Sequence, residues 1–124
     1  MANGINGNCK TNDVAASETK PPLKFLFVSK ESASGDLAWT LKKEGHEVKD
    51  FGAFSFDPDD DYPDFMNPAA LEVAKDQENS RGIFLGGSGQ GEAMVANRYK
   101  GVRAAVLYNY NEDMIRLTRE HNNS

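Results

Sequence analysis

Residues 81–97, RGIFLGGSGQGEAMVAN, contain the pattern that decides the fold of this chain. A short apolar run at 82–85 enters a turn with four glycines in six residues, and a helix-forming segment with Glu92 in its first turn follows. Glycine lets the backbone approach a ligand closely, and N–H groups at the start of a helix attract negative charge. The stretch therefore predicts a strand, an anion-binding loop and a carboxylate placed to transfer a proton on a small anionic substrate.

Strands and helices are expected to alternate on both sides of this stretch. Strands are predicted at 23–29, 46–51, 82–85 and 104–107, and helices at 37–44, 69–75, 92–98 and 112–121. This order predicts an α/β fold, a three-layer, Rossmann-like, doubly wound parallel sheet with helices on both faces. Ligands bind beyond the carboxyl ends of the strands in such sheets. We therefore expect the chemistry in the loops 29–35, 54–64 and 86–92 and in the loop after Leu107.

Length and composition indicate one domain behind a polar tail. The chain has 124 residues, and residues 1–22 are poor in large apolar side chains. They predict a disordered tail at 1–22 and a single domain at 23–124.

Charge and hydropathy exclude several classes of partner. A net charge of −5 argues against nucleic acid as the main partner, because phosphates require a basic surface. No run approaches the ~18 apolar residues of a membrane span, so no membrane partner is expected. The single cysteine, Cys9, allows no intrachain disulfide, and no secretion signal is recognisable. A cytoplasmic location is therefore expected.

The glycine-rich loop fits neither common nucleotide motif. A mononucleotide P-loop has Lys after its last glycine, where this chain has Glu92, and the spacing of 87–91 is one residue short of the dinucleotide fingerprint. Two roles remain open for Glu92. It complements the dipole of its helix, or it faces the loop as a catalytic base.

Several separated motifs carry a family resemblance. They are GHEV at 45–48, DFG at 50–52, DYPD at 61–64, GGSGQGE at 86–92, AN at 96–97, GVRAA at 101–105 and REHN at 119–122. In this order they resemble type B ribose-5-phosphate isomerases and the related galactose-6-phosphate isomerase subunits. In that family the base is either a cysteine at the start of the glycine loop or a glutamate at its end. With Gly86 at the start and Glu92 at the end, the chain is similar to the glutamate branch.

The resemblance implies aldose–ketose isomerisation of a sugar phosphate, ribose-5-phosphate to ribulose-5-phosphate, through an enediolate. It implies catalytic roles for Glu92 as base, His121 in opening the sugar ring and Ser88 near the reacting oxygens. The substrate-binding residues that it implies are Gly87, Gly89, Gln90, Gly91, Asn97, Tyr62, Asp61 and Asn122. It implies no metal and no cofactor, and a homodimer or tetramer as the assembly.

The chain departs from the family pattern in two places. Family members carry Asp and His after the first strand, where this chain has SKESASG at 29–35, and they continue beyond the position of Ser124 to basic residues that hold the phosphate. Residues 24–48 are also similar to the opening of an ATP-grasp ligase. These departures lead us to expect a domain that is incomplete at its C-terminus. Two alternatives stay open: an impaired module that binds sugar phosphates or nucleotides without turnover, and a folded fragment that requires a partner.

Overall fold

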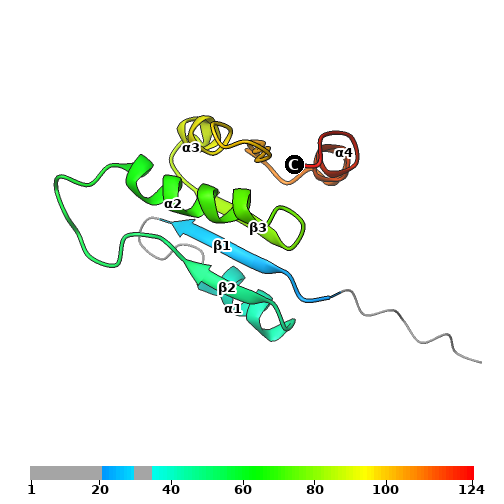
Figure 1. Ribbon diagram of the computed structural model, residues 1–124, viewed down its shortest axis with the longest axis horizontal. Coiled ribbons are helices and arrows are strands. Elements are labelled where there is room, and N and C mark those ends of the chain that lie inside the picture. The colour runs from blue at the N-terminus through cyan, green and yellow to red at the C-terminus, as the bar shows by residue number, and fades with distance from the viewer. Residues whose placement is uncertain (1–20, 30–34) are drawn as a thin grey trace, which may run out of the picture.

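The computed structural model describes residues 21–29 and 35–124 (Figure 1). Its elements are β1 (Lys24–Ser29), α1 (Gly35–Lys43), β2 (Glu47–Asp50), α2 (Tyr62–Lys75), β3 (Ser80–Leu85), α3 (Gln90–Ala96) and α4 (Glu112–Asn122). The predicted tail at 1–22, with Cys9, lies outside the described residues except for Pro21 and Pro22.

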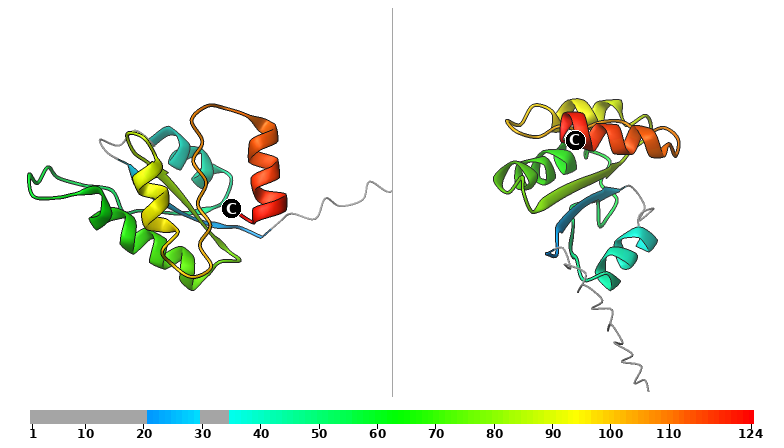
Figure 2. Two further views of the ribbon diagram at one scale, coloured as in Figure 1. Left: turned by 90° about the horizontal axis from the view of Figure 1, so that it is seen from above. Right: turned by 90° about the vertical axis from the view of Figure 1, so that its right-hand side faces the viewer.

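The described strands form a parallel sheet in the order β2-β1-β3. Leu26 of the central strand pairs with Lys49 of β2 and with Gly82 of β3. The central strand is buried on both faces, with Leu26 and Phe27 almost fully enclosed, as its continuous apolar run requires. Helix α1 covers one face, and α2 and α3 cover the other (Figure 2). The predicted α/β class, with a parallel sheet between two helical layers, is confirmed.

The core joins the sheet to α2 and α3. Val28, Met66, Ala69 and Val95 form its buried cluster. Small side chains on α2 let the helix lie close to the sheet, since Ala69 and Ala70 are completely buried. This packing places the start of α3, and with it the glycine loop, at the carboxyl end of β3.

Helix α2 begins seven residues earlier than predicted. The expected start after Pro68 is wrong, because the helix starts at Tyr62 and continues through Pro68. A capping box starts the helix: the Asp61 carboxylate accepts a hydrogen bond from the Tyr62 N–H at 2.8 Å, and the Asp64 carboxylate accepts one from the Asp61 N–H at 3.1 Å. Burial of Met66 and Ala69 on either side of Pro68 offsets the helix bond that proline cannot donate.

Removal of the N-cap should destabilise the domain measurably. Asp61→Ala is expected to lower the free energy of unfolding by about 1 kcal/mol, the usual contribution of an N-cap carboxylate. Urea denaturation followed by far-UV circular dichroism measures the change. Asp60→Ala is the matched control, because Asp60 is exposed and its side chain makes no hydrogen bond within residues 21–29 and 35–124. Equal destabilisation by both variants would contradict the capping role.

The predicted strand at 104–107 does not form. The segment is extended but joins no ladder in the described sheet, and a cavity separates it from β3. Its alternation is nevertheless that of a strand, since Val102, Ala104 and Val106 are partly buried while the residues between them are exposed. The Val106 side chain on the sheltered side packs against Gly89 at the start of α3, and the Asn97 side chain binds the Ala104 backbone. The segment therefore has the periodicity of a strand, but the N–H and C=O of Ala104 are bonded to the Asn97 side chain and not to a neighbouring strand.

Helix α4 stands apart from the core. It agrees with the predicted helix at 112–121 to within one residue, and none of its residues is buried. Asn111 caps it by accepting a hydrogen bond from the Met114 N–H at 2.9 Å. Within the described ranges, no helix is long and apolar enough to cross a membrane.

Candidate active site

The glycine-rich loop connects β3 to α3 in a conformation that requires glycine. Gly89 is the N-cap of α3 and has a φ of 73°, in the left-handed region. The Ser88 hydroxyl oxygen accepts a hydrogen bond from the Gln90 N–H at 3.3 Å. Loop and helix start thus form one unit at the carboxyl end of the sheet, where ligands bind in this class of fold.

Glu92 lies in the first turn of α3 and is only 9% exposed. Its side chain folds back over the start of the loop: a methyl group on Gly86 would lie 1.7 Å from the Glu92 Oε1 atom. The carboxylate therefore occupies the space that any side chain at position 86 would need. Among the described residues, no hydrogen bond or ion pair holds this carboxylate, so it is available to accept a proton from a ligand.

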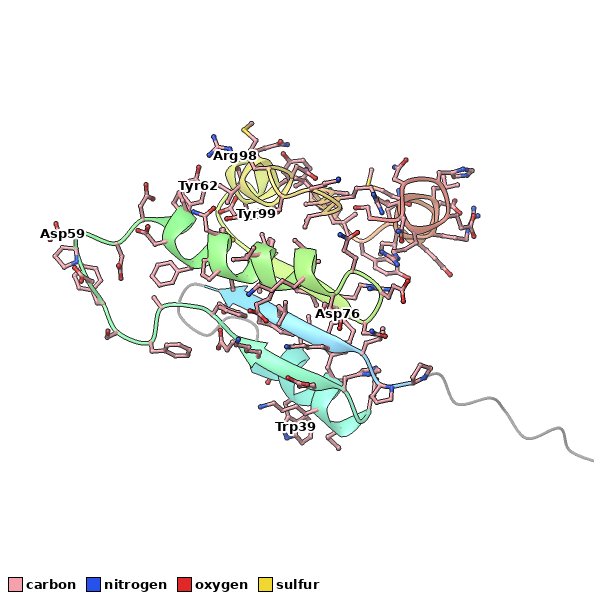
Figure 3. All side chains as sticks on the ribbon, in the orientation of Figure 1. Trp39, Asp59, Tyr62, Asp76, Arg98 and Tyr99 are labelled. Atoms are coloured by element: carbon pink, nitrogen blue, oxygen red, sulfur yellow. The ribbon has the colours of Figure 1, made fainter. Side chains whose placement is uncertain are left out.

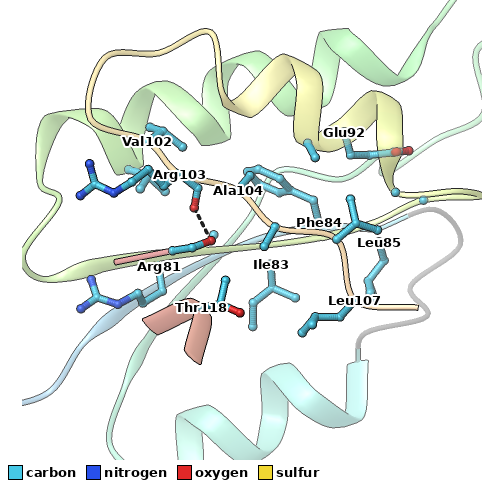
Figure 4. Close-up of a pocket in the computed structure, with 18 of the residues that line it drawn as sticks. Arg81, Ile83, Phe84, Leu85, Glu92, Val102, Arg103, Ala104, Leu107 and Thr118 are labelled. Carbon is cyan, nitrogen blue, oxygen red and sulfur yellow. Dashed lines mark hydrogen bonds between the residues drawn. The ribbon is translucent and has the colours of Figure 1, made fainter. Parts of the chain in front are cut away.

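A cavity of about 600 Å3 extends from the glycine loop along β3 (Figure 4). Its walls are β3, the extended segment after α3 and one side of α4. Gly87, Ser88, Gly89 and Glu92 line one end, so the structure brings together the predicted base and the predicted loop residues. The cavity is large enough for a small sugar phosphate.

Arginines line the end of the cavity far from Glu92. Arg81 and Arg103 lie there, opposite Glu92 (Figure 4), and Arg119 of α4 lines the same cavity. The pKa of Arg81 is lowered from its very high ordinary value, mainly by burial and also by the positive charge of Arg119. The described residues contain no group of three or more His, Cys, Asp or Glu that could hold a metal ion.

Tyr62 lies beside the glycine loop although it comes 30 residues before Glu92. A methyl group on Gly91 would lie 2.9 Å from the Tyr62 hydroxyl oxygen, so the phenol packs directly over the first turn of α3. Figure 3 shows Tyr62 at the start of α2, on the side of α3. Asp61 is next to it, but its carboxylate caps α2. The structure thus brings Tyr62 to the predicted site and gives Asp61 a structural role.

Two residues that were predicted to bind substrate form hydrogen bonds with other residues of the chain. Asn97 donates a hydrogen bond from Nδ2 to the Ala104 carbonyl oxygen at 3.0 Å, and its Oδ1 accepts one from the Ala104 N–H at 2.8 Å. Gln90 donates from Nε2 to the Tyr108 hydroxyl oxygen. In this structure both amides connect α3 to the segment that follows it.

The predicted residues of α4 lie away from Glu92. His121 and Asn122 are exposed, and neither lines the cavity that the described residues form. Their neighbours Arg119 and Asn123 do line it. A single copy of the chain therefore does not bring His121 and Glu92 together.

Two residues near the loop had no role assigned from the sequence, although the loop after Leu107, which begins with Tyr108, was expected to contribute to the site. Val106 packs against Gly89, where a methyl group would lie 2.9 Å from its Cγ1 atom, and Tyr108 binds Gln90. For Val106 the signal in the sequence is the strand periodicity of 104–108, and for Tyr108 it is also the position directly after a predicted strand. The periodicity shows that alternate residues share a side, but not which element that side faces.

Comparison with known proteins identifies a family and several relatives that are similar to this chain. The family described as Ribose/Galactose Isomerase matches residues 30–124. Ribose-5-phosphate isomerase B of Mycobacterium leprae is 48% identical over 84 residues, which are 68% of this chain and 50% of that protein. The enzyme of the same name from Mycolicibacterium paratuberculosis is 46% identical over 84 residues, 68% of this chain and 51% of the relative. The chain thus spans about half the length of these curated relatives.

Solved structures show the same fold. Ribose-5-phosphate isomerase B of Mycoplasma genitalium, solved with bound ribulose-5-phosphate, superposes with a TM-score of 0.73 at 33% identity over 82% of this chain and 68% of that one. The Thermotoga maritima protein superposes with a TM-score of 0.68 at 35% identity over 82% and 70% of the two chains. The family match begins at residue 30 and includes α1 and β2, so it covers most of the stretch 24–48 for which a resemblance to a ligase was considered. With its glycine loop, its buried glutamate and these matches, the chain belongs to the ribose/galactose isomerase family.

Proposed function

We propose that this chain isomerises a sugar phosphate between its aldose and ketose forms, with ribose-5-phosphate and ribulose-5-phosphate as the substrate pair. One observation carries the proposal: the Glu92 carboxylate is buried, free of partners among the described residues, and seated at the end of the glycine loop on a cavity of suitable size. Family membership and the ribulose-5-phosphate held by the M. genitalium relative support the choice of substrate.

The proposed reaction transfers one proton between neighbouring carbons. Glu92 removes the proton from C2 of the open-chain aldose, the electron pair forms the C1–C2 double bond, and negative charge develops on the C1 oxygen. Backbone N–H groups of the loop 87–91 stabilise that charge. Glu92 returns the proton to C1, and the proton of the C2 hydroxyl moves to the C1 oxygen, which leaves a C2 ketone. The reaction is balanced without a redox partner.

The other predicted residues complete the proposal. Ser88 hydrogen-bonds the reacting oxygens, and Tyr62 lines the sugar side of the site. His121 opens the sugar ring, with Asn122 beside it, in an assembly where a second copy supplies them to the Glu92 cavity. A homodimer or tetramer is therefore part of the proposal, as is a cytoplasmic location. Sedimentation velocity tests the assembly, and a clean monomer with full activity would contradict the role of the second copy.

Turnover by the purified chain tests the proposed activity. Ribulose-5-phosphate formed from saturating ribose-5-phosphate should exceed the uncatalysed rate, and circular dichroism should show a folded protein in the same sample. If the folded chain binds ribose-5-phosphate in calorimetry but forms no ketose, the active-enzyme proposal is wrong. It is then replaced by the alternative, a module that binds sugar phosphates without turnover.

A further inference from the structure

The segment 104–108 is attached to the glycine loop and α3 at three successive points. Asn97 binds both backbone groups of Ala104, Val106 packs against Gly89, and the Tyr108 hydroxyl accepts a hydrogen bond from Gln90. Ala104 makes its contact through its backbone N–H and C=O, whereas Val106 and Tyr108 make theirs through their side chains. The segment is therefore attached to both ends of α3, and at the N-terminal end it contacts the last part of the glycine loop.

The contact of Tyr108 is with Gln90, which comes two residues before the proposed base Glu92 in the chain. Gln90 is the first residue of α3, and its N–H is bonded to the Ser88 hydroxyl, so its side chain extends the hydrogen bonds of the loop to Tyr108. Tyr108 lines the cavity together with Ser88, Gly89 and Glu92. A substitution of Tyr108 therefore affects the hydrogen bonds of the loop although it replaces no residue of the loop itself.

A glycine-rich loop requires such a support. Four glycines within 86–91 give the free backbone many accessible conformations, and the structure uses a left-handed one at Gly89. A misplacement of about 1 Å at a reacting group is enough to reduce rates roughly 10²-fold. External hydrogen bonds that select one loop conformation therefore affect the position of the Glu92 carboxylate.

We propose that Tyr108 is a positioning residue, whose hydroxyl holds Gln90 and thereby fixes the glycine loop and Glu92 for proton transfer. This inference rests on the proposed isomerase function. It also changes the role of Gln90, which serves as the link between loop and segment and not as a sugar contact.

Kinetics of Tyr108→Phe test the proposal. The turnover number is expected to fall about fivefold to tenfold, the factor that corresponds to the loss of one neutral hydrogen bond, while KM changes less than about twofold. Gln90→Met removes the same bond from the other side and should have the same effect, and the double variant should be no worse than either single one. Tyr110→Phe is the matched control, because Tyr110 is exposed at 84% and Tyr108 at 66%, but Tyr110 has no hydrogen bond within the described ranges. It should behave as the unmodified chain.

Amide hydrogen exchange gives a test that does not depend on turnover. In folded Tyr108→Phe, exchange of the amides at 88–92 should accelerate at least about threefold, while the amides of the central strand stay unchanged. Three results would each overturn the positioning role. They are unchanged amide exchange at 88–92, additive losses of turnover in the double variant, and a rise in KM at constant turnover number. Absence of turnover in the unmodified chain would instead refute the proposed function, and the exchange measurement would still decide the role of Tyr108.

Discussion

Glu92→Gln is expected to lower the turnover number for ribose-5-phosphate roughly 10²- to 10⁴-fold, the range in which a general base contributes to catalysis. Glutamine has the same shape and keeps the packing over Gly86, but its amide cannot accept the C2 proton. Because the substitution alters proton transfer and not the cavity, the dissociation constant for ribose-5-phosphate should change by less than about threefold. Stopped assays of ribulose-5-phosphate and calorimetry measure the two quantities.

Glu112→Gln is the matched control for this experiment. Glu112 also lies in the first turn of a helix, but it is exposed on α4 and has no ion pair among the described residues. Its substitution should leave both turnover and binding unchanged. Exchange of the C2 proton of the substrate with deuterated solvent should disappear only in Glu92→Gln. If Glu92→Gln retains more than about a tenth of the activity, Glu92 is not the general base.

Gly86→Ala is expected to cause a loss of similar size without touching any group that reacts. The added methyl would lie 1.7 Å from the Glu92 Oε1 atom, 2.3 Å from Cδ and 3.0 Å from Cγ. The carboxylate must leave its position, because backbone on both sides prevents the methyl from moving. A displacement of this size should reduce the turnover number by roughly 10²-fold or more. In this chain, a side chain at position 86 and the present position of the Glu92 carboxylate are therefore incompatible.

The double variant Gly86→Ala with Glu92→Gln separates displacement of the base from damage to the fold. It should be no less active than Glu92→Gln alone, because a glutamine at position 92 does not take part in proton transfer and its displacement causes no further loss of turnover. Gly35→Ala is the control for the substitution itself, because a methyl there meets no atom within 4 Å. Full activity in folded Gly86→Ala would contradict the position of Glu92 described above.

The local elements of the fold were largely predictable. The apolar run of β1 and the sequence from β3 through the glycine turn into α3 were expected within about two residues, because each carries its own local signal. The predicted start of α2 is wrong, because Pro68 resembles a helix start signal but lies inside the helix, whereas the capping box at Asp61 and Asp64 marks the true start. The segment 104–107 shows the limit of periodicity, because alternation does not specify a hydrogen-bonding partner.

By itself, the sequence determined the alternation of strands and helices, the glycine loop ending in Glu92 and the family resemblance. All of these depend on residues close together in the chain, or on motifs in a recognisable order. Only the tertiary structure decided that the Glu92 carboxylate fills the space beside Gly86, that Tyr108 holds Gln90, and that His121 lies away from the cavity. Tyr108 meets Gln90 only because the segment after α3 packs back against the start of that helix, and His121 is kept from the cavity by the placement of α4. Gly86 and Glu92 are only six residues apart, but the turn of the loop into α3 decides that the carboxylate folds back over Gly86. Packing of this kind depends on the summed shape of many side chains, which no local pattern specifies.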